Sequence, residues 1–176
     1  PLARSADDLK LALSIMSGPA EREALGWSLN LPAADITTLK DFRVAVWATD
    51  PLAPVATEVE DRSMRVGAML ERLGAQVSYD ARPDFDLDAA IRNYQTLLQS
   101  VMTAAWDNQA VAKMQTKVSA LEPNDMSLDA VNARAAVLSH RDWIRSNGRR
   151  EKLRRAWADF FKDWDILICP QMSAVT

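Results

Sequence analysis

The chain has 176 residues, of which 48% are hydrophobic and 26% are charged. These fractions are typical of a soluble globular protein and exclude a chain that is disordered throughout. The formal net charge of −3 gives no electrostatic reason to expect nucleic acid or an anionic membrane as a partner. There is neither a bilayer-spanning apolar run nor a signal-peptide pattern, so we expect a cytoplasmic protein without membrane contacts.

The first predicted helix follows Ser5, a typical N-cap residue, and has Asp7 and Asp8 in its first turn. Its apolar residues recur at three- and four-residue spacing: Leu9, Ala12, Leu13 and Met16. Gly18-Pro19 then ends the helix.

A strand–helix–strand unit is the clearest pattern in the chain. Residues 42–47 (FRVAVW) and 76–80 (QVSYD) predict two short strands. Between them, residues 55–73 have helical spacing and end at Gly74, which suits a left-handed helix cap. Such units are normally parallel with a right-handed crossover. The chain therefore belongs to the α/β class, and we expect one domain over residues 1–176.

Most of the remaining chain is predicted to be helical. Asp84 or Asp86 can cap a helix whose apolar face is Leu87, Ile91, Tyr94, Leu97, Leu98, Val101 and Met102. A weaker helix covers 111–121, and Ser127 caps a long helix that continues through residue 144. Asn147-Gly148 predicts a break before a last helix over 152–161. Residues 165–169 predict a buried strand that ends at Pro170.

Chemical motifs are sparse. Cys169 lies in the apolar run 165–169 and is expected inside the sheet. A cysteine nucleophile would need a base, and no motif ties Cys169 to His140, the one histidine. The carboxylates of Asp80, Asp84, Asp86 and Asp88 are explained by capping, so no metal or other cofactor is expected. The six tryptophans fall at apolar positions and are expected to pack in the core: Trp27, Trp47, Trp106, Trp143, Trp157 and Trp164.

Two segments resemble the amidase signature family of hydrolases. The run PLARS at 1–5, with the helix after it, is similar to the end of the family's core region. The run WADFFKDWDILICP at 157–170 is similar to the family's Trp-x-x-Phe-Phe-x-x-Tyr-Asp-Val-Leu-Leu-x-Pro segment. Trp164 stands where tyrosine is commoner, and CPQM at 169–172 replaces the frequent Thr-Pro-Thr. These departures bear on which substrate is bound more than on membership of the family.

The resemblance implies hydrolysis of a C–N amide bond by a serine nucleophile. In the family, the catalytic serines and lysine lie upstream of the PLARS run. We therefore expect the chain to be the C-terminal part of an amidase signature domain, inactive alone, whose partner is a small-molecule amide. The resemblance also implies a share in the substrate pocket, at Pro170, Gln171 and Met172 and, as weaker candidates, Tyr94, Leu98 and Met102. The sequence is also compatible with a homo-oligomer.

A non-catalytic binding or assembly module is the alternative. Seven basic and two acidic residues lie between Arg141 and Arg155, and such a helix can bind an anionic partner. A solvated helix face explains the same run in a chain that is acidic as a whole. A Rossmann-type half domain fits less well, since no glycine-rich turn follows Trp47.

Overall fold

The computed structural model describes residues 2–32 and 38–174. The chain divides into two compact units, Pro1–Thr37 and Thr38–Thr176, and one domain over the whole chain stays a prediction. The first unit contains α1 (Ala6–Met16), whose N-cap is Ser5 as predicted: the Ser5 hydroxyl accepts a hydrogen bond from the Asp8 amide at 3.1 Å. No residue of α1 is buried.

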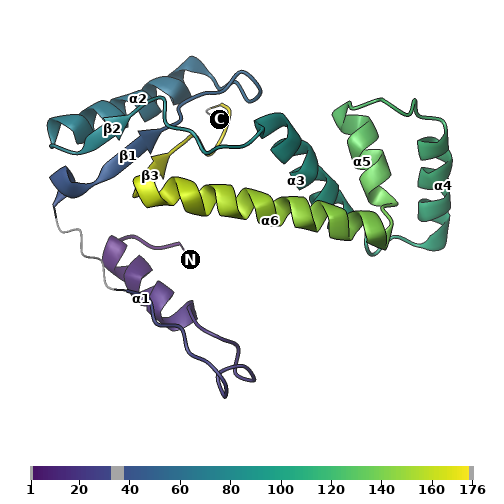
Figure 1. Ribbon diagram of the computed structural model, residues 1–176, viewed down its shortest axis with the longest axis horizontal. Helices are drawn as coiled ribbons and strands as arrows, with labels where there is room; N and C mark the ends of the chain where they lie inside the picture. Colours follow the sequence, from purple (N-terminus) through teal and green to yellow (C-terminus); the bar gives the residue numbers. More distant parts are fainter. Residues whose placement is uncertain (1, 33–37, 175–176) are drawn as a thin grey trace. The chain divides into compact units, whose positions relative to one another are not determined.

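The second unit is built around a three-stranded parallel sheet in the order β2-β1-β3 (Figure 1). The central strand β1 (Arg43–Val46) pairs with β2 (Gln76–Ser78) and with β3 (Ile166–Ile168). The 3₁₀ turn η1 (Leu39–Asp41) precedes β1, and α2 (Thr57–Arg72) makes the predicted crossover to β2. Gly74 has a φ of +97° after α2, which confirms the left-handed cap expected there.

The core lies between α2 and the sheet. Val44, Val46, Ala48 and Ala75 are buried there, and Leu70, Tyr79 and Ile168 are among the side chains packed against them. β1 is apolar on consecutive residues because a parallel strand between two neighbours is covered on both faces.

Four helices form the rest of this unit: α3 (Leu87–Met102), α4 (Asn108–Ser119), α5 (Leu128–Ala136) and α6 (His140–Asp163). α3 packs against α5 and α6, and α4 packs against α5. Asp86 and Ser127 are the N-caps of α3 and α5, as predicted. The structure is thus helix-rich with a short parallel sheet, which confirms the α/β class.

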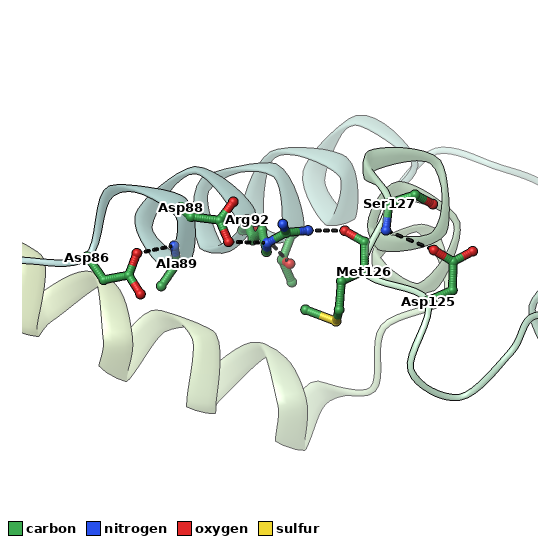
Figure 2. Close-up of polar contacts among 8 residues, drawn as sticks. Asp86, Asp88, Ala89, Arg92, Asp125, Met126 and Ser127 are labelled. Atoms are coloured by element: carbon green, nitrogen blue, oxygen red, sulfur yellow. Dashed lines mark hydrogen bonds and ion pairs between the residues drawn. The ribbon is translucent and has the colours of Figure 1, made fainter. Parts of the chain in front are cut away.

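Arg92 joins α3 to the loop before α5 (Figure 2). Its Nε lies 2.8 Å from an Asp88 carboxylate oxygen, one turn back along α3. Its guanidinium also donates to the Met126 carbonyl. The neighbouring Asp125 carboxylate accepts from the Ser127 amide at 2.8 Å, which lowers the pKa of Asp125. One arginine therefore fixes the α4–α5 loop against α3.

The predicted position of the helix break was wrong. α5 ends at Ala136, and α6 runs without interruption through Gly148. Ser139 sets the new start: its hydroxyl accepts from the Asp142 amide at 3.1 Å and donates to the Asp142 carboxylate at 2.6 Å. Such a cap contributes about 1 kcal/mol. A glycine inside a long helix costs about the same and does not end it.

Two burial predictions were also wrong. Cys169 is exposed, because β3 ends at Ile168 and the thiol belongs to the segment after the strand. Trp27 and Trp106 are 52% and 39% exposed, since neither lies in a helix or strand that packs on the core. Trp157 does pack, with ring centroids 5.6 Å from Phe85 and 5.7 Å from Phe160.

Within residues 2–32 and 38–174, none of the helices combines the length and apolar character that crossing a membrane requires.

Candidate functional site

The carboxyl ends of β1 and β3 lie at the same edge of the sheet, because the two strands are parallel. The Trp47 amide donates to the Ile168 carbonyl at 2.8 Å and extends the pairing by one residue past β1. Beyond this bond the two backbone segments diverge. The segment after β1 leads to α2, and the segment after β3 continues along residues 169–174. Crevices outside the carboxyl ends of parallel strands are common ligand sites.

A cavity of about 310 Å³ opens at this edge. Three segments line it: the residues after β1, the residues after β3 and the start of α3. The lining residues are Trp47, Ala48, Thr49, Asp50, Ala53, Pro54, Val55, Leu87, Cys169, Pro170, Gln171, Met172 and Ser173. Most of these side chains are apolar, and the volume is that of a small-molecule site.

Two hydrogen bonds hold the rim of this strand-end cavity. The Ala56 amide, at the N-cap of α2, donates to the Ser173 carbonyl at 2.7 Å. The Asp50 carboxylate accepts from the Leu52 amide at 2.9 Å and shapes the turn after β1. The segment after β3 is thereby tied to the start of α2.

A second cavity, of about 350 Å³, is also lined by this segment. Val59, Arg62, Ser63 and Val66 of α2 form one wall of it. The opposite wall is made of Cys169, Pro170, Gln171, Met172 and Ala174. Residues 169–172 therefore line two cavities at once.

The structure brings together only some of the predicted pocket residues. Pro170, Gln171 and Met172 line the strand-end cavity, whereas Tyr94 and Leu98 line a separate groove of about 450 Å³ between α3 and α6. Met102 lines none of the cavities described here and is 67% exposed. A helix rises 1.5 Å per residue, so the later turns of α3 lie ~10 Å or more beyond Leu87.

Sequence reasoning missed the contribution of the β1 side. Trp47, Asp50 and Leu87 line the strand-end cavity, although the sequence pattern predicted only a strand for Trp47 and a helix face for Leu87. The available signal was Asp50-Pro51, a polar turn directly after a buried parallel strand. Such a turn marks the edge of the sheet where sites form.

An ion pair fixes β3 at its start. Arg43 Nη2 lies 2.8 Å from Asp165 Oδ1, and the Arg43 amide and Nε both donate to Asp165 Oδ2. The Asp165 amide returns a hydrogen bond to the Arg43 carbonyl at 2.9 Å. The bonds from the Arg43 side chain and amide lower the pKa of the Asp165 carboxyl. They anchor β3, and with it the segment that lines both cavities.

Catalytic groups are not assembled among the described residues. No serine hydroxyl there hydrogen-bonds to a lysine or a histidine. His140 is the first residue of α6 and Cys169 follows β3, which comes after that helix in the chain, and no hydrogen bond joins the two side chains in the described structure. In the described ranges no three His, Cys, Asp or Glu residues come close enough to hold a metal ion.

The basic residues of α6 are largely engaged within the molecule. Arg145 pairs with Asp142 at 3.2 Å, and Arg150 and Arg154 both pair with Glu151. Arg149 donates to the buried Asn93 at 3.0 Å, a packing contact between α6 and α3. This run stabilises its own helix and the α3 contact.

Comparison with known proteins identifies one family. All of residues 1–176 match the sequence model of the amidase family. Indoleacetamide hydrolase of Bradyrhizobium diazoefficiens is 27% identical over 170 residues, which cover 97% of this chain and 30% of that protein. Indoleacetamide hydrolase of Bradyrhizobium japonicum is 24% identical over 172 residues, 97% of this chain and 34% of that protein. The chain thus spans about a third of the length of these relatives. No solved structure matches it significantly.

Proposed function

This chain belongs to the amidase family, and on that premise we propose that it forms part of the substrate pocket of an enzyme that hydrolyses C–N amide bonds. The strand-end cavity receives the acyl part of a small-molecule amide. Pro170, Gln171 and Met172 form the wall that follows β3. The match over the full chain, together with a cavity at the carboxyl ends of β1 and β3, carries this proposal.

A serine outside residues 1–176 supplies the nucleophile in this proposal. A serine nucleophile needs a general base within hydrogen-bond reach and donors for the oxyanion. The serine hydroxyls that form hydrogen bonds in the described residues instead bond to carbonyls, to backbone amides or to neighbouring polar side chains in their own helices or turns. A nucleophile outside these residues agrees with the resemblance of the PLARS run to the end of the family's core region, because the family's catalytic serines and lysine lie upstream of that run.

The names of the two relatives suggest indole-3-acetamide as the first substrate to test. We expect the complete protein encoded by the gene that contains this sequence to release ammonia from it. A serine-directed fluorophosphonate should label that protein and leave the isolated 176-residue chain unlabelled. Stoichiometric labelling of the isolated chain would show that the nucleophile lies within it.

Substitutions then test the pocket. Gln171→Ala and Met172→Ala should each change kcat/KM by a factor that differs between amides. Met102→Ala is the matched control, because Met102 is about as exposed as Met172 but lies outside the cavity. Unchanged kcat/KM for every amide in both pocket variants would contradict the assignment.

A further inference from the structure

The indole of Trp47 is held from two sides beside the strand-end cavity. Its Nε1 donates to Asp50 Oδ2 at 3.2 Å. The guanidinium carbon of Arg82 lies 4.8 Å from the ring centroid, within the range of a cation–π contact. The hydrogen bond holds the edge of the indole and the guanidinium covers its ring, so the side chain has little freedom to rotate. The same part of the indole therefore always faces the cavity.

Asp50 is committed to this arrangement. Its second oxygen, Oδ1, accepts from the Leu52 amide at 2.9 Å, so each carboxylate oxygen already has a donor within the loop. The carboxylate therefore orients Trp47 and closes the turn.

Arg82 is committed as well. Its Nη1 donates to the carbonyls of Ala81 at 2.8 Å and Tyr79 at 3.1 Å, within the loop after β2. The same nitrogen reaches the carbonyl of Val46, the last residue of β1, at 3.4 Å. Arg82 thus ties the β2–α3 loop to the end of β1 and fixes its own guanidinium against Trp47.

The cavity that Trp47 lines offers no basic side chain to pair with an anionic ligand. None of its thirteen described lining residues is lysine, arginine or histidine, and Asp50 is its one carboxylate. Burying an unpaired charge is costly. Ala48, Ala53, Pro54, Val55, Leu87 and Met172 supply an apolar lining instead.

We infer that Trp47 is a specificity-determining residue of this cavity, positioned by Asp50 and Arg82, and that the cavity takes an uncharged, apolar acyl group. This inference rests on the proposed function and names the substrate class of the same site. Asp50 and Arg82 are positioning residues, because they act through the indole.

Kinetics of the complete protein test the inference with phenylacetamide, 4-carboxyphenylacetamide and propionamide, the last of which is too small to fill the cavity. The unsubstituted protein should prefer phenylacetamide to its carboxylated analogue. Asp50→Ala and Arg82→Gln should each lower kcat/KM for phenylacetamide about three- to tenfold, mainly through KM, as expected for the loss of one hydrogen bond or ring contact. The loss for propionamide should be smaller, because this substrate is too small to fill the cavity.

Conservative variants separate positioning from folding. Asp50→Asn keeps an acceptor for the indole and should recover part of the loss, whereas Trp47→Phe should behave like Asp50→Ala because it lacks the donor. Arg65→Gln is the control: Arg65 is exposed on α2 and bonds only within that helix. Equal losses for phenylacetamide and propionamide, or a preference for the carboxylated amide, would overturn the inference.

Binding to the 176-residue chain gives a readout that does not need hydrolysis. The indole N–H resonance of Trp47, assigned by its absence in Trp47→Phe, should shift and saturate on titration with phenylacetamide but not with 4-carboxyphenylacetamide. This result would stand even if the complete protein hydrolysed no amide, which would contradict the proposed function alone. An unchanged Trp47 resonance with phenylacetamide would overturn the inference itself.

Discussion

Gly67 lets α2 approach the sheet closely. A Cβ atom built at Gly67 would lie 3.0 Å from Tyr79 ring and hydroxyl atoms and 3.0 Å from Val46 Cγ2. Both neighbours belong to the packed core, so neither can move without disturbing it. Gly148, in α6, has no atom within 4 Å of the corresponding position.

These two glycines predict opposite effects of the same substitution. Gly67→Ala should destabilise the protein by about 1–3 kcal/mol through overpacking, which exceeds the ~1 kcal/mol gain in helix propensity. Gly148→Ala, the matched control, should stabilise it by about 0.5–1 kcal/mol. Urea unfolding followed by circular dichroism measures both, and a stabilised Gly67→Ala variant would contradict the close packing.

The Arg43–Asp165 ion pair predicts a pH dependence. Hydrogen bonds from Arg43 lower the pKa of Asp165 below its ordinary value of 3.8. A carboxyl whose pKa is lower in the folded state contributes stability above its unfolded pKa, and that contribution is lost as the pH falls through the folded pKa. The pair therefore stabilises the protein at neutral pH and ceases to do so in acid.

Asp165→Asn tests this dependence. We expect the variant to melt below the unsubstituted protein at pH 7, and the gap to narrow as the pH falls below about 4. Asp61→Asn is the control, since Asp61 is exposed on α2. The comparison uses Tm from circular dichroism between pH 3 and 7. A gap that stays constant over this range would show that Asp165 acts through shape alone.

At the scale of elements, local capping signals predicted three helix starts correctly. Ser5, Asp86 and Ser127 cap their helices as the sequence indicated, because an N-cap is a local bond between a side chain and an amide three residues on. The start of α6 was missed although Ser139 has the same local geometry. The glycine at 148 is the more conspicuous breaker, but its effect depends on the tertiary support of the helix.

Ser139 therefore predicts where α6 begins. Ser139→Ala removes the acceptor for the Asp142 amide and should cost about 0.5–2 kcal/mol of unfolding free energy. Ser139→Asp should retain most of the stability, because aspartate is also a good N-cap. Ser119→Ala serves as control, since Ser119 ends α4 and bonds only to the Thr116 carbonyl one turn back. Equal stabilities of Ser139→Ala and Ser119→Ala would show that the cap does not define the helix.

At the scale of the whole molecule, the sequence predicted three of the thirteen described residues that line the strand-end cavity. Pro170, Gln171 and Met172 follow a strand that apolar pattern alone reveals. To predict that Trp47 and Asp50 line the cavity, one must know that β3 lies beside β1. To predict the same for Leu87, one must know the direction of α3. These arrangements belong to the tertiary structure. The hydrogen bonds that stabilise them join residues such as Arg43 and Asp165, which are 122 positions apart.

This long-range pairing predicts how the molecule folds. β3 joins β1 only after a large loop has closed, an entropic cost that delays such contacts. Ile168→Val should therefore raise the unfolding rate and leave the folding rate nearly unchanged, as for contacts that form after the transition state. Val131→Ala, within the locally connected α3–α5 pair, provides the comparison. Stopped-flow measurements over a range of urea concentrations give both rates; a slower folding rate in Ile168→Val would place β3 in the folding nucleus.

The double role of residues 169–172 has a thermodynamic consequence. This one stretch of backbone is a wall of the strand-end cavity and also of the cavity against α2. A molecule that binds in either cavity and displaces the wall changes the free energy of binding in the other. Because such linkage is reciprocal, each occupant alters the affinity of the other by the same factor.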